Sequence, residues 1–129
     1  MRNMQPRLTA LLACQDNLMP LSWHMPVSKE PFRYAVAVRE ENYTHHLLRE
    51  HKSFTLNFLP FEFYESVDEM GAYHGNQVDK YPQSPFKNAS YDPKGNLLLE
   101  EAYMIYECAL IDTYQNGDHT IFIADVTSV

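Results

Sequence analysis

Strand-like segments that follow one another along the chain are the feature that most constrains the fold. These segments are apolar or alternate between apolar and polar residues, and only two helix-like segments come between them. Successive strands that are not linked by helical crossovers pair antiparallel. We therefore expect a mainly β fold, an antiparallel barrel with two flanking helices, rather than a doubly wound parallel sheet. The expected strands are 7–14, 18–24, 33–38, 53–59, 97–113 and 119–129.

Prolines and turn residues refine this expectation. Pro20 interrupts the second expected strand and favours a sheet edge or a bulge, because proline has no N–H for the ladder. Residues 25–31 contain two prolines and are expected to form a connector. The Asn-Gly pair within residues 115–118 is typical of a hairpin turn, and it predicts that the last two strands pair.

Two helices are expected between the strands. The first covers residues 45–51, with Thr44 as its N-cap. The second opens at Pro60, and its apolar residues recur at helical spacing. These residues are Phe63, Val67 and Met70, and Gly71 or Gly75 ends the helix. Residues 76–96 form a long polar loop, which in a compact domain is usually functional or packed over another segment.

Composition and charge narrow the class of protein. The 129 residues correspond to one domain, 1–129, large enough to bury a core without disulfides or metals. The balance of 10 Lys and Arg against 17 Asp and Glu argues against a nucleic-acid partner. No apolar run is long enough to cross a bilayer, and the N-terminal residues lack the features of a signal peptide. Cys14 and Cys108 lie far apart without metal-ligand spacing, which fits a reducing cytoplasm.

Two segments could contact a ligand, and each has a purely structural alternative. Residues 22–28 offer an aromatic wall and strand-end backbone groups to a planar ligand, but the local pattern alone favours Trp23 as a core residue beside turn hydroxyls. Residues 39–44 place amides and the Thr44 hydroxyl at a helix start, where a phosphate can bind. Ordinary helix capping explains Thr44 as well, and two neighbouring glutamates oppose an anion.

Histidines form the third group of candidates. His119, just after the expected hairpin turn, could donate to a ligand or relay a proton near neutral pH, or it could be an ordinary exposed turn residue. The spacing of His45, His46 and His51 does not match a helical zinc pair, so no metal site is expected. No dinucleotide-binding motif, phosphate-binding loop or serine-hydrolase motif is present.

Five stretches considered together carry a family resemblance. They are NLMPLSWHMPVS (17–28), NYTHHLL (42–48), FTLNFLP (54–60), GNQVDKY (75–81) and ECALIDTYQNGDHTIFIADV (107–126). In this order they resemble the flavin reductase-like family with the FMN-binding split-barrel fold, and most closely its flavoredoxin-type branch. The resemblance implies an antiparallel split β-barrel that binds FMN.

The resemblance also implies which residues form the site. Residues 17–25 are implied to line the isoalloxazine ring, residues 42–44 to hold the FMN phosphate, and His119 to lie by the nicotinamide or the flavin. The implied FMN-binding residues are Asn17, Met19, Ser22, Trp23, His24, Met25, Asn42, Tyr43, Thr44, Asp79 and Lys80, and His119 is the implied catalytic residue.

The implied function is that of an oxidoreductase. It is an NAD(P)H-dependent flavin reductase that passes electrons from NADH or NADPH to free flavin or to a protein acceptor. The alternatives are an FMN electron carrier without its own nicotinamide site, and a split barrel that binds no flavin. The resemblance further implies a homodimer with FMN near the subunit interface. The residues do not distinguish NADH from NADPH or identify the acceptor.

Overall fold

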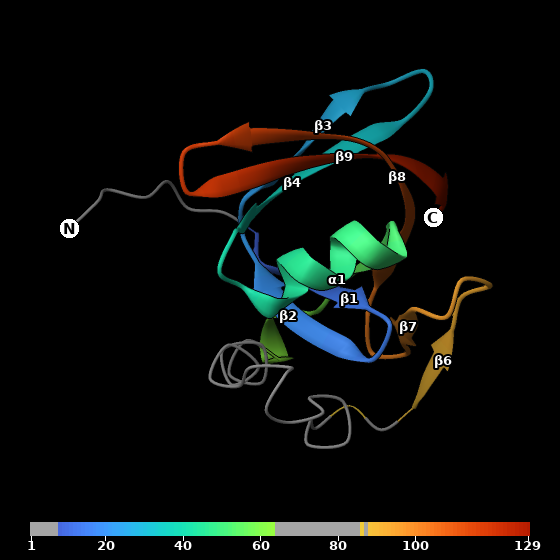
Figure 1. The fold of residues 1–129 in the computed structure, drawn as a ribbon. Helices are drawn as coiled ribbons and strands as arrows, with labels where there is room; N and C mark the ends of the chain where they lie inside the picture. Colours follow the sequence, from blue (N-terminus) through green and yellow to red (C-terminus); the bar gives the residue numbers. More distant parts are fainter. Residues whose placement is uncertain (1–7, 64–85, 87) are drawn as a thin grey trace.

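A curled antiparallel sheet dominates the computed structural model, which describes residues 8–63, 86 and 88–129 (Figure 1). The sheet has seven strands in the order β2-β1-β5-β8-β9-β4-β3. Their bounds are β1 Ala10–Cys14, β2 Asn17–Leu21, β3 His24–Ser28, β4 Arg33–Arg39, β5 Ser53–Phe58, β8 Met104–Asn116 and β9 His119–Ser128. This architecture confirms the expected mainly β, antiparallel split-barrel fold.

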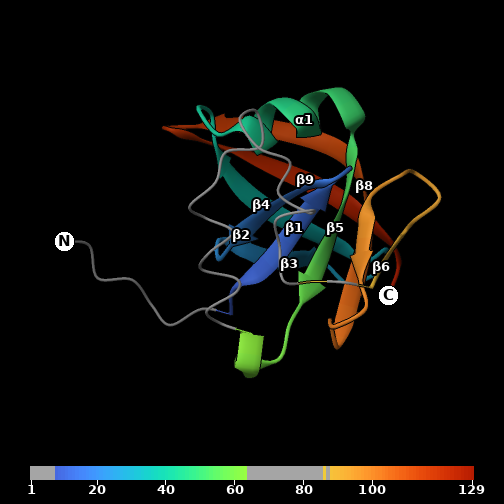
Figure 2. The ribbon, with the colours of Figure 1, turned by 90° about the horizontal axis from the view of Figure 1, so that it is seen from below.

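Smaller elements cover this sheet. A separate pair of strands, β6 (Ala89–Tyr91) and β7 (Leu97–Leu99), forms its own antiparallel ladder. Helix α1 (Tyr43–His51) contacts β1, β4 and β5, and Figures 1 and 2 show it lying across the curl of the sheet. A short 3-10 helix, η1 (Phe61–Phe63), follows β5.

Strand β5 shows how the core forms on both faces of the sheet. Phe54 and Leu56 are fully buried in the main core cluster, as expected for alternating apolar residues. The intervening polar residues are buried too, because the segment containing β7 covers the other face. Thr55 donates to the Leu97 carbonyl at 2.6 Å, and Asn57 donates to the Leu11 carbonyl at 3.2 Å and accepts from the Leu99 amide at 3.0 Å. The alternation therefore marks a strand that is buried on both faces, one apolar and one hydrogen-bonded.

The region around residues 18–31 differs from the expectation. The single strand expected over 18–24 is two strands, β2 and β3, and the expected connector over 25–31 is largely β3. The prediction was wrong because Pro26 is tolerated in β3, an edge strand whose outer side needs no ladder N–H. The edge position expected for Pro20 is confirmed, since β2 is the opposite edge of the sheet.

Helix α1 forms where it was expected, but a different residue caps it. Asn42 is the N-cap, and its side chain accepts from the Thr44 amide at 3.1 Å. Thr44 lies in the first turn instead, because its side chain is buried beneath the helix. At the other end, Lys52 takes the left-handed conformation and its amide donates to the Leu48 carbonyl.

The C-terminal half contains two further differences. The single strand expected over 97–113 is broken between β7 and β8, and β6 lies within the loop expected over 76–96. The last hairpin is confirmed, with β8 continuing to Asn116 and a tight turn at residues 117–118. Of the second expected helix only η1 falls in the described part of the chain. Val67, Met70, Gly71 and Gly75 lie outside the described residues.

Replacing Asn57 is expected to destabilise the fold strongly. Asn57→Ala leaves the Leu11 carbonyl and the Leu99 amide without their buried partner, and we expect the free energy of unfolding to fall by about 3 kcal/mol. Urea denaturation measures this loss. Asn88→Ala, at an exposed asparagine, is the matched control and is expected to change stability by less than about 0.5 kcal/mol. Equal effects of the two substitutions would contradict the role of the buried network.

Candidate functional site

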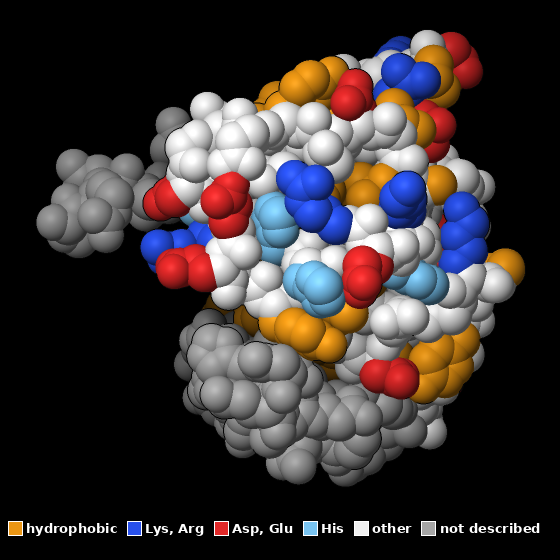
Figure 3. All heavy atoms as spheres, viewed as in Figure 1, with side chains coloured by type: hydrophobic (Ala, Val, Ile, Leu, Met, Phe, Trp, Pro, Cys, Tyr) orange, Lys and Arg blue, Asp and Glu red, His pale blue; other side chains and the backbone are white. Residues whose placement is uncertain are grey.

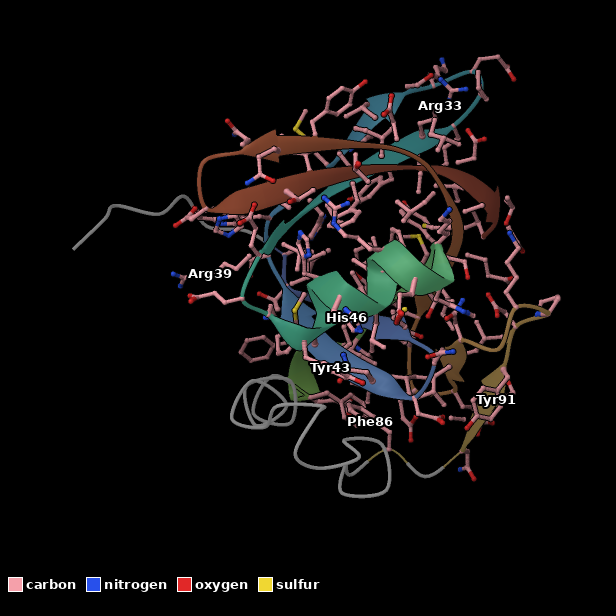
Figure 4. All side chains as sticks on the ribbon, viewed as in Figure 1. Arg33, Arg39, Tyr43, His46, Phe86 and Tyr91 are labelled. Atoms are coloured by element: carbon pink, nitrogen blue, oxygen red, sulfur yellow. The ribbon has the colours of Figure 1, made fainter. Side chains whose placement is uncertain are left out.

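An open recess lies where β2 ends, β4 ends and α1 begins. Its volume is about 240 Å³. The lining residues are Met19, Pro20, Leu21, Ser22, Trp23, Ala37, Val38, Arg39, Asn42 and His119. Figure 4 shows Arg39 at the end of β4, close to the start of α1 where Tyr43 lies. Three parts of the chain that are distant in the sequence, residues 19–23, residues 37–42 and His119, therefore meet at one hollow.

Backbone pairing brings the two rings of the recess together. The Ala37 amide donates to the Trp23 carbonyl at 3.0 Å, which holds the segment after β2 against β4. Strand β9 pairs with the other side of β4, and His119 is directly opposite Arg39. As a result the rings of Trp23 and His119 stack, with centroids 4.6 Å apart and planes inclined by 29°. This pair presents an aromatic surface and a titratable ring to the same space.

His119 has a carboxylate partner in the adjoining turn. Its Nδ1 lies 2.6 Å from Oδ1 of Asp118, and this hydrogen bond holds the pKa of Asp118 below its usual range. The two side chains differ in exposure: that of His119 is 18% exposed and that of Asp118 75%. The imidazole is therefore enclosed in the recess while its partner faces solvent.

The start of α1 provides the polar end of the recess. Asn42 lines the hollow and also holds the Thr44 amide. The Thr44 hydroxyl is buried and accepts from Nδ2 of Asn17 at 2.8 Å. Oδ1 of that same Asn17 is buried and has no hydrogen-bond partner in the described structure. This buried acceptor lies next to the residues that hold the start of α1.

Charge at this end comes from Arg39. Its Nη2 lies 3.2 Å from Oε1 of Glu41, and both side chains are largely exposed. An exposed pair of this kind is weak, so it can be exchanged for a ligand anion at little cost. Helix capping by Asn42 accounts for the Thr44 amide, and Arg39 places a cation beside the same helix start.

The helix is also tied to β9 beneath the recess. His45 is buried, and its Nε2 lies 2.8 Å from the hydroxyl oxygen of Thr120, the residue after His119. Its ring also meets Phe122 edge-on. Burial, and next the nearby charge of Arg49, lower the pKa of His45. A neutral histidine thus links the first turn of α1 to the strand that carries His119.

The structure brings together only part of the predicted site. Met19, Ser22, Trp23, Asn42 and His119 line the recess. Thr44 and Asn17 lie next to it, because Thr44 bonds Asn42 and Asn17 bonds Thr44. The half-buried ring of Tyr43 packs near His46.

Two other predicted residues face elsewhere. His24 sits on the core side, with Nδ1 2.7 Å from the Tyr34 hydroxyl and Nε2 2.7 Å from the Leu8 carbonyl. Met25, the next residue of β3, is exposed on the opposite face of the sheet. Asp79 and Lys80 lie outside the described residues.

The comparisons with known proteins agree with this geometry. Residues 4–129 match the flavin reductase like domain. The chain belongs to this family. It also spans 43 to 65% of the length of curated relatives from Aeropyrum pernix, Pyrococcus abyssi and Archaeoglobus fulgidus, at 25 to 29% identity.

Solved structures show the same flavin reductase-like fold. An FMN-binding protein from Thermus thermophilus is 27% identical, with a TM-score of 0.86 over 99% of this chain and 78% of its own. A flavoredoxin from Methanosarcina acetivorans is 22% identical, with a TM-score of 0.85 over 99% and 74%. The NADH:FAD oxidoreductase SgcE6 of Streptomyces globisporus is 21% identical, with a TM-score of 0.86 over 96% and 74%. The last two likenesses establish the shared fold alone.

In this flavin reductase-like chain the sequence analysis missed two of the residues that line the recess. They are Ala37 and Val38 of β4, whereas Pro20, Leu21 and Arg39 fall within the segments 17–25 and 39–44 that it singled out. Pairing the expected strands in register would also have placed Arg39 opposite His119. The small and apolar residues carry no chemical signal of their own.

Within residues 8–63, 86 and 88–129, no three His, Cys, Asp or Glu side chains are grouped so that they could hold a metal ion. In the same ranges no helix is both long and apolar enough to span a bilayer.

Acid is expected to destabilise the protein partly through His45. Because the pKa of His45 is lowered in the folded state, the unfolded chain binds more protons below its ordinary value of 6.5. The stability that depends on neutral His45 is therefore fully present above pH 6.5 and is lost as the pH falls below that value. We expect His45→Gln, which keeps a donor for Thr120, to show a shallower loss of stability between pH 7.5 and 5 than the unsubstituted protein, measured by urea denaturation. His46→Gln, on the exposed side of α1, is the control and should keep the original slope.

Proposed function

We propose that this chain binds FMN in the recess and works as an NAD(P)H-dependent flavin reductase, passing electrons to free flavin or to a protein acceptor. The observation that carries the proposal is the stacked Trp23 and His119 pair beside Arg39, in a member of the flavin reductase-like family. FMN, when bound, accepts a hydride and passes electrons on singly or in pairs. The protein's own task is to hold the cofactor, orient it and present a nicotinamide to it.

The residues of the recess fit the three parts of FMN. Trp23 offers a flat apolar surface for the isoalloxazine ring, with Met19 and Ser22 along the same strand end. Oδ1 of Asn17 lacks a partner. Because an amide oxygen only accepts hydrogen bonds, it suits a hydroxyl donor of the ribityl chain rather than a phosphate oxygen. Arg39 supplies the cation for the phosphate.

The start of α1 supports the phosphate end of the proposed site. Asn42 lines the recess beside Arg39, and the bond from the Thr44 amide to its side chain orients it. Tyr43 and Thr44 are proposed to act from behind Asn42 rather than on the phosphate directly. Asp79 and Lys80, implied by the family resemblance, remain proposed FMN-binding residues.

His119 is the residue proposed to meet the nicotinamide. Its ring is held by the stack with Trp23 and by the hydrogen bond to Asp118, so it does not need to be ordered when the substrate arrives. An imidazole in the recess can donate or accept a hydrogen bond near neutral pH. The Streptomyces protein of the same fold is an NADH:FAD oxidoreductase, which supports a nicotinamide as the electron donor.

We also propose that the protein forms a homodimer through the outer face of β3, β4, β9 and β8. On this face, the residues that alternate with the core residues include the charged Asp112, Arg33 and Asp125 and six apolar ones. The apolar residues are Met25, Ala35, Ala37, Tyr114, Ile121 and Ile123. Met25 is 57% exposed and Tyr114 53%, and in Figure 3 hydrophobic side chains run along the upper edge, above β8 and β3. Because Trp23 and His119 adjoin this face, a second copy would stand beside the recess.

A titration followed by both visible absorption and fluorescence tests the proposed function. The purified protein is titrated with FMN and then with NADH or NADPH without oxygen. We expect quenching of Trp23, the only tryptophan, as FMN binds, followed by bleaching of the flavin bands by one of the nicotinamides. If dithionite bleaches the flavin bands but NADH and NADPH do not, the protein is an electron carrier and not a nicotinamide-dependent reductase. FMN that stays fully fluorescent would contradict flavin binding.

Substitution of Arg39 is expected to separate FMN from riboflavin. Arg39→Gln removes a charge-assisted bond to the phosphate, so FMN affinity should fall about tenfold while riboflavin affinity stays unchanged. Glu41→Gln frees Arg39 and should strengthen FMN binding by about twofold. Arg49→Gln, on an exposed position of α1, is the matched control. Equal losses for the two flavins, read from fluorescence quenching, would place the phosphate elsewhere.

A charge on the outer face is expected to separate the proposed dimer. Met25→Glu puts a carboxylate into the face on both copies, and we expect the mass from light scattering to halve. Tyr103→Glu, at an exposed tyrosine outside this face, should leave the mass unchanged. A dimer that survives Met25→Glu, or a monomeric starting protein, would contradict this interface.

A further inference from the structure

The turn between β8 and β9 is held firmly against the end of β4. Gly117 has a φ of +62°, a conformation suited to glycine at the first position of a tight hairpin turn. The backbone carbonyl of Asp118 accepts from the Glu40 amide at 3.2 Å. The Gln115 side-chain amide donates to Glu40 and, at 3.3 Å, to the Gly117 carbonyl. The position of Asp118 is therefore defined by the bond to the Glu40 backbone and by the bonds of Gln115 to Glu40 and Gly117.

Two contacts fix the imidazole that follows this turn. The face of His119 stacks on Trp23, and its Nδ1 lies 2.6 Å from the Asp118 carboxylate. The hydrogen bond to His119, and the charge of Arg39 nearby, keep the pKa of Asp118 below its usual range. Asp118 is thus ionised at neutral pH and can only accept.

The chemistry of this contact assigns the proton on the ring. An ionised carboxylate has no hydrogen to donate, so the hydrogen between the two atoms belongs to Nδ1 of His119. A neutral imidazole carries one N–H, which leaves Nε2 with its lone pair. Nε2 is therefore the atom of the His119 ring that can accept a hydrogen bond, and the His119 side chain lines the recess.

We propose that Asp118 is a positioning residue that holds His119 in the Nδ1-protonated tautomer, so that Nε2 accepts a hydrogen bond or a proton from a ligand in the recess. This inference deepens the proposed function and rests on it for the identity of the ligand. It excludes the opposite arrangement, in which a neutral His119 donates from Nε2. Trp23 restricts the tilt of the ring, and Asp118 selects which nitrogen faces the ligand.

The tautomer can be measured without any cofactor. Protein with 15N-labelled histidine is studied free of flavin at a pH where the ring is neutral, by long-range proton–nitrogen spectra, and the His119 signals are assigned by their loss in His119→Ala. We expect Nδ1 of His119 to be of the protonated type and Nε2 of the unprotonated type. Asp118→Ala should move the ring toward a mixture of the two tautomers.

A matched control distinguishes positioning from a general effect of removing charge. Asp112 is another exposed aspartate, on β8, and its carboxylate accepts from the Tyr114 hydroxyl rather than bonding His119. Asp112→Ala should leave the His119 nitrogen signals unchanged. A protonated Nε2 in the unsubstituted protein, or identical His119 signals in Asp118→Ala, would overturn the inference. The backbone amide spectrum confirms that each variant is folded.

Turnover gives the second readout. Asp118→Ala should lower the rate of nicotinamide oxidation about tenfold while FMN affinity, read by quenching of Trp23, changes less than twofold. An unchanged rate with an altered tautomer would overturn the role of Asp118 in turnover. Absence of nicotinamide oxidation in the unsubstituted protein would contradict the proposed function instead, and the tautomer comparison would still decide whether Asp118 positions His119.

Discussion

The pairing of β9 with β4 is the interaction on which the recess depends. It runs in register along the whole of β4, from Arg33 opposite Asp125 to Arg39 opposite His119. The Arg33 and Asp125 side chains also bond at 2.9 Å at one end of the ladder. At the other end the same register sets His119 beside the segment held by the Ala37 amide, where Trp23 lies. A shift of one residue would move His119 to the core face and remove the aromatic pair.

Buried polar contacts then position the helix over this sheet. His45 bonds Thr120 on β9, and Thr44 bonds Asn17 on β2. These two bonds join the first turn of α1 to strands on both sides of the curl. Because each contact is buried, breaking one leaves an unsatisfied polar group, which makes the arrangement specific as well as stable. Asn42 and Arg39 are thereby held at the polar end of the recess.

Much of the fold was predictable because it depends on local patterns. Alternating residues predicted β5, the apolar run predicted β4, and Asn116-Gly117 predicted the last hairpin. The division of residues 18–31 into β2 and β3 was not predictable, because it depends on both strands lying at sheet edges where Pro20 and Pro26 are tolerated. At the recess, segments 17–25 and 39–44 and His119 had been singled out from the sequence, whereas Ala37 and Val38 of β4 carry no chemical signal and could not be.

Residue order alone therefore accounts for the succession of antiparallel strands, the position of α1 and the few polar and aromatic residues that could bind a ligand. These follow from side-chain periodicity and turn chemistry, which act between near neighbours. The folded sheet decided the rest. Trp23 and His119 meet only because β3, β4 and β9 lie side by side, and Asn17 bonds Thr44 only because the fold brings β2 to the first turn of α1. Contacts between distant residues depend on register and curl, which no local pattern encodes.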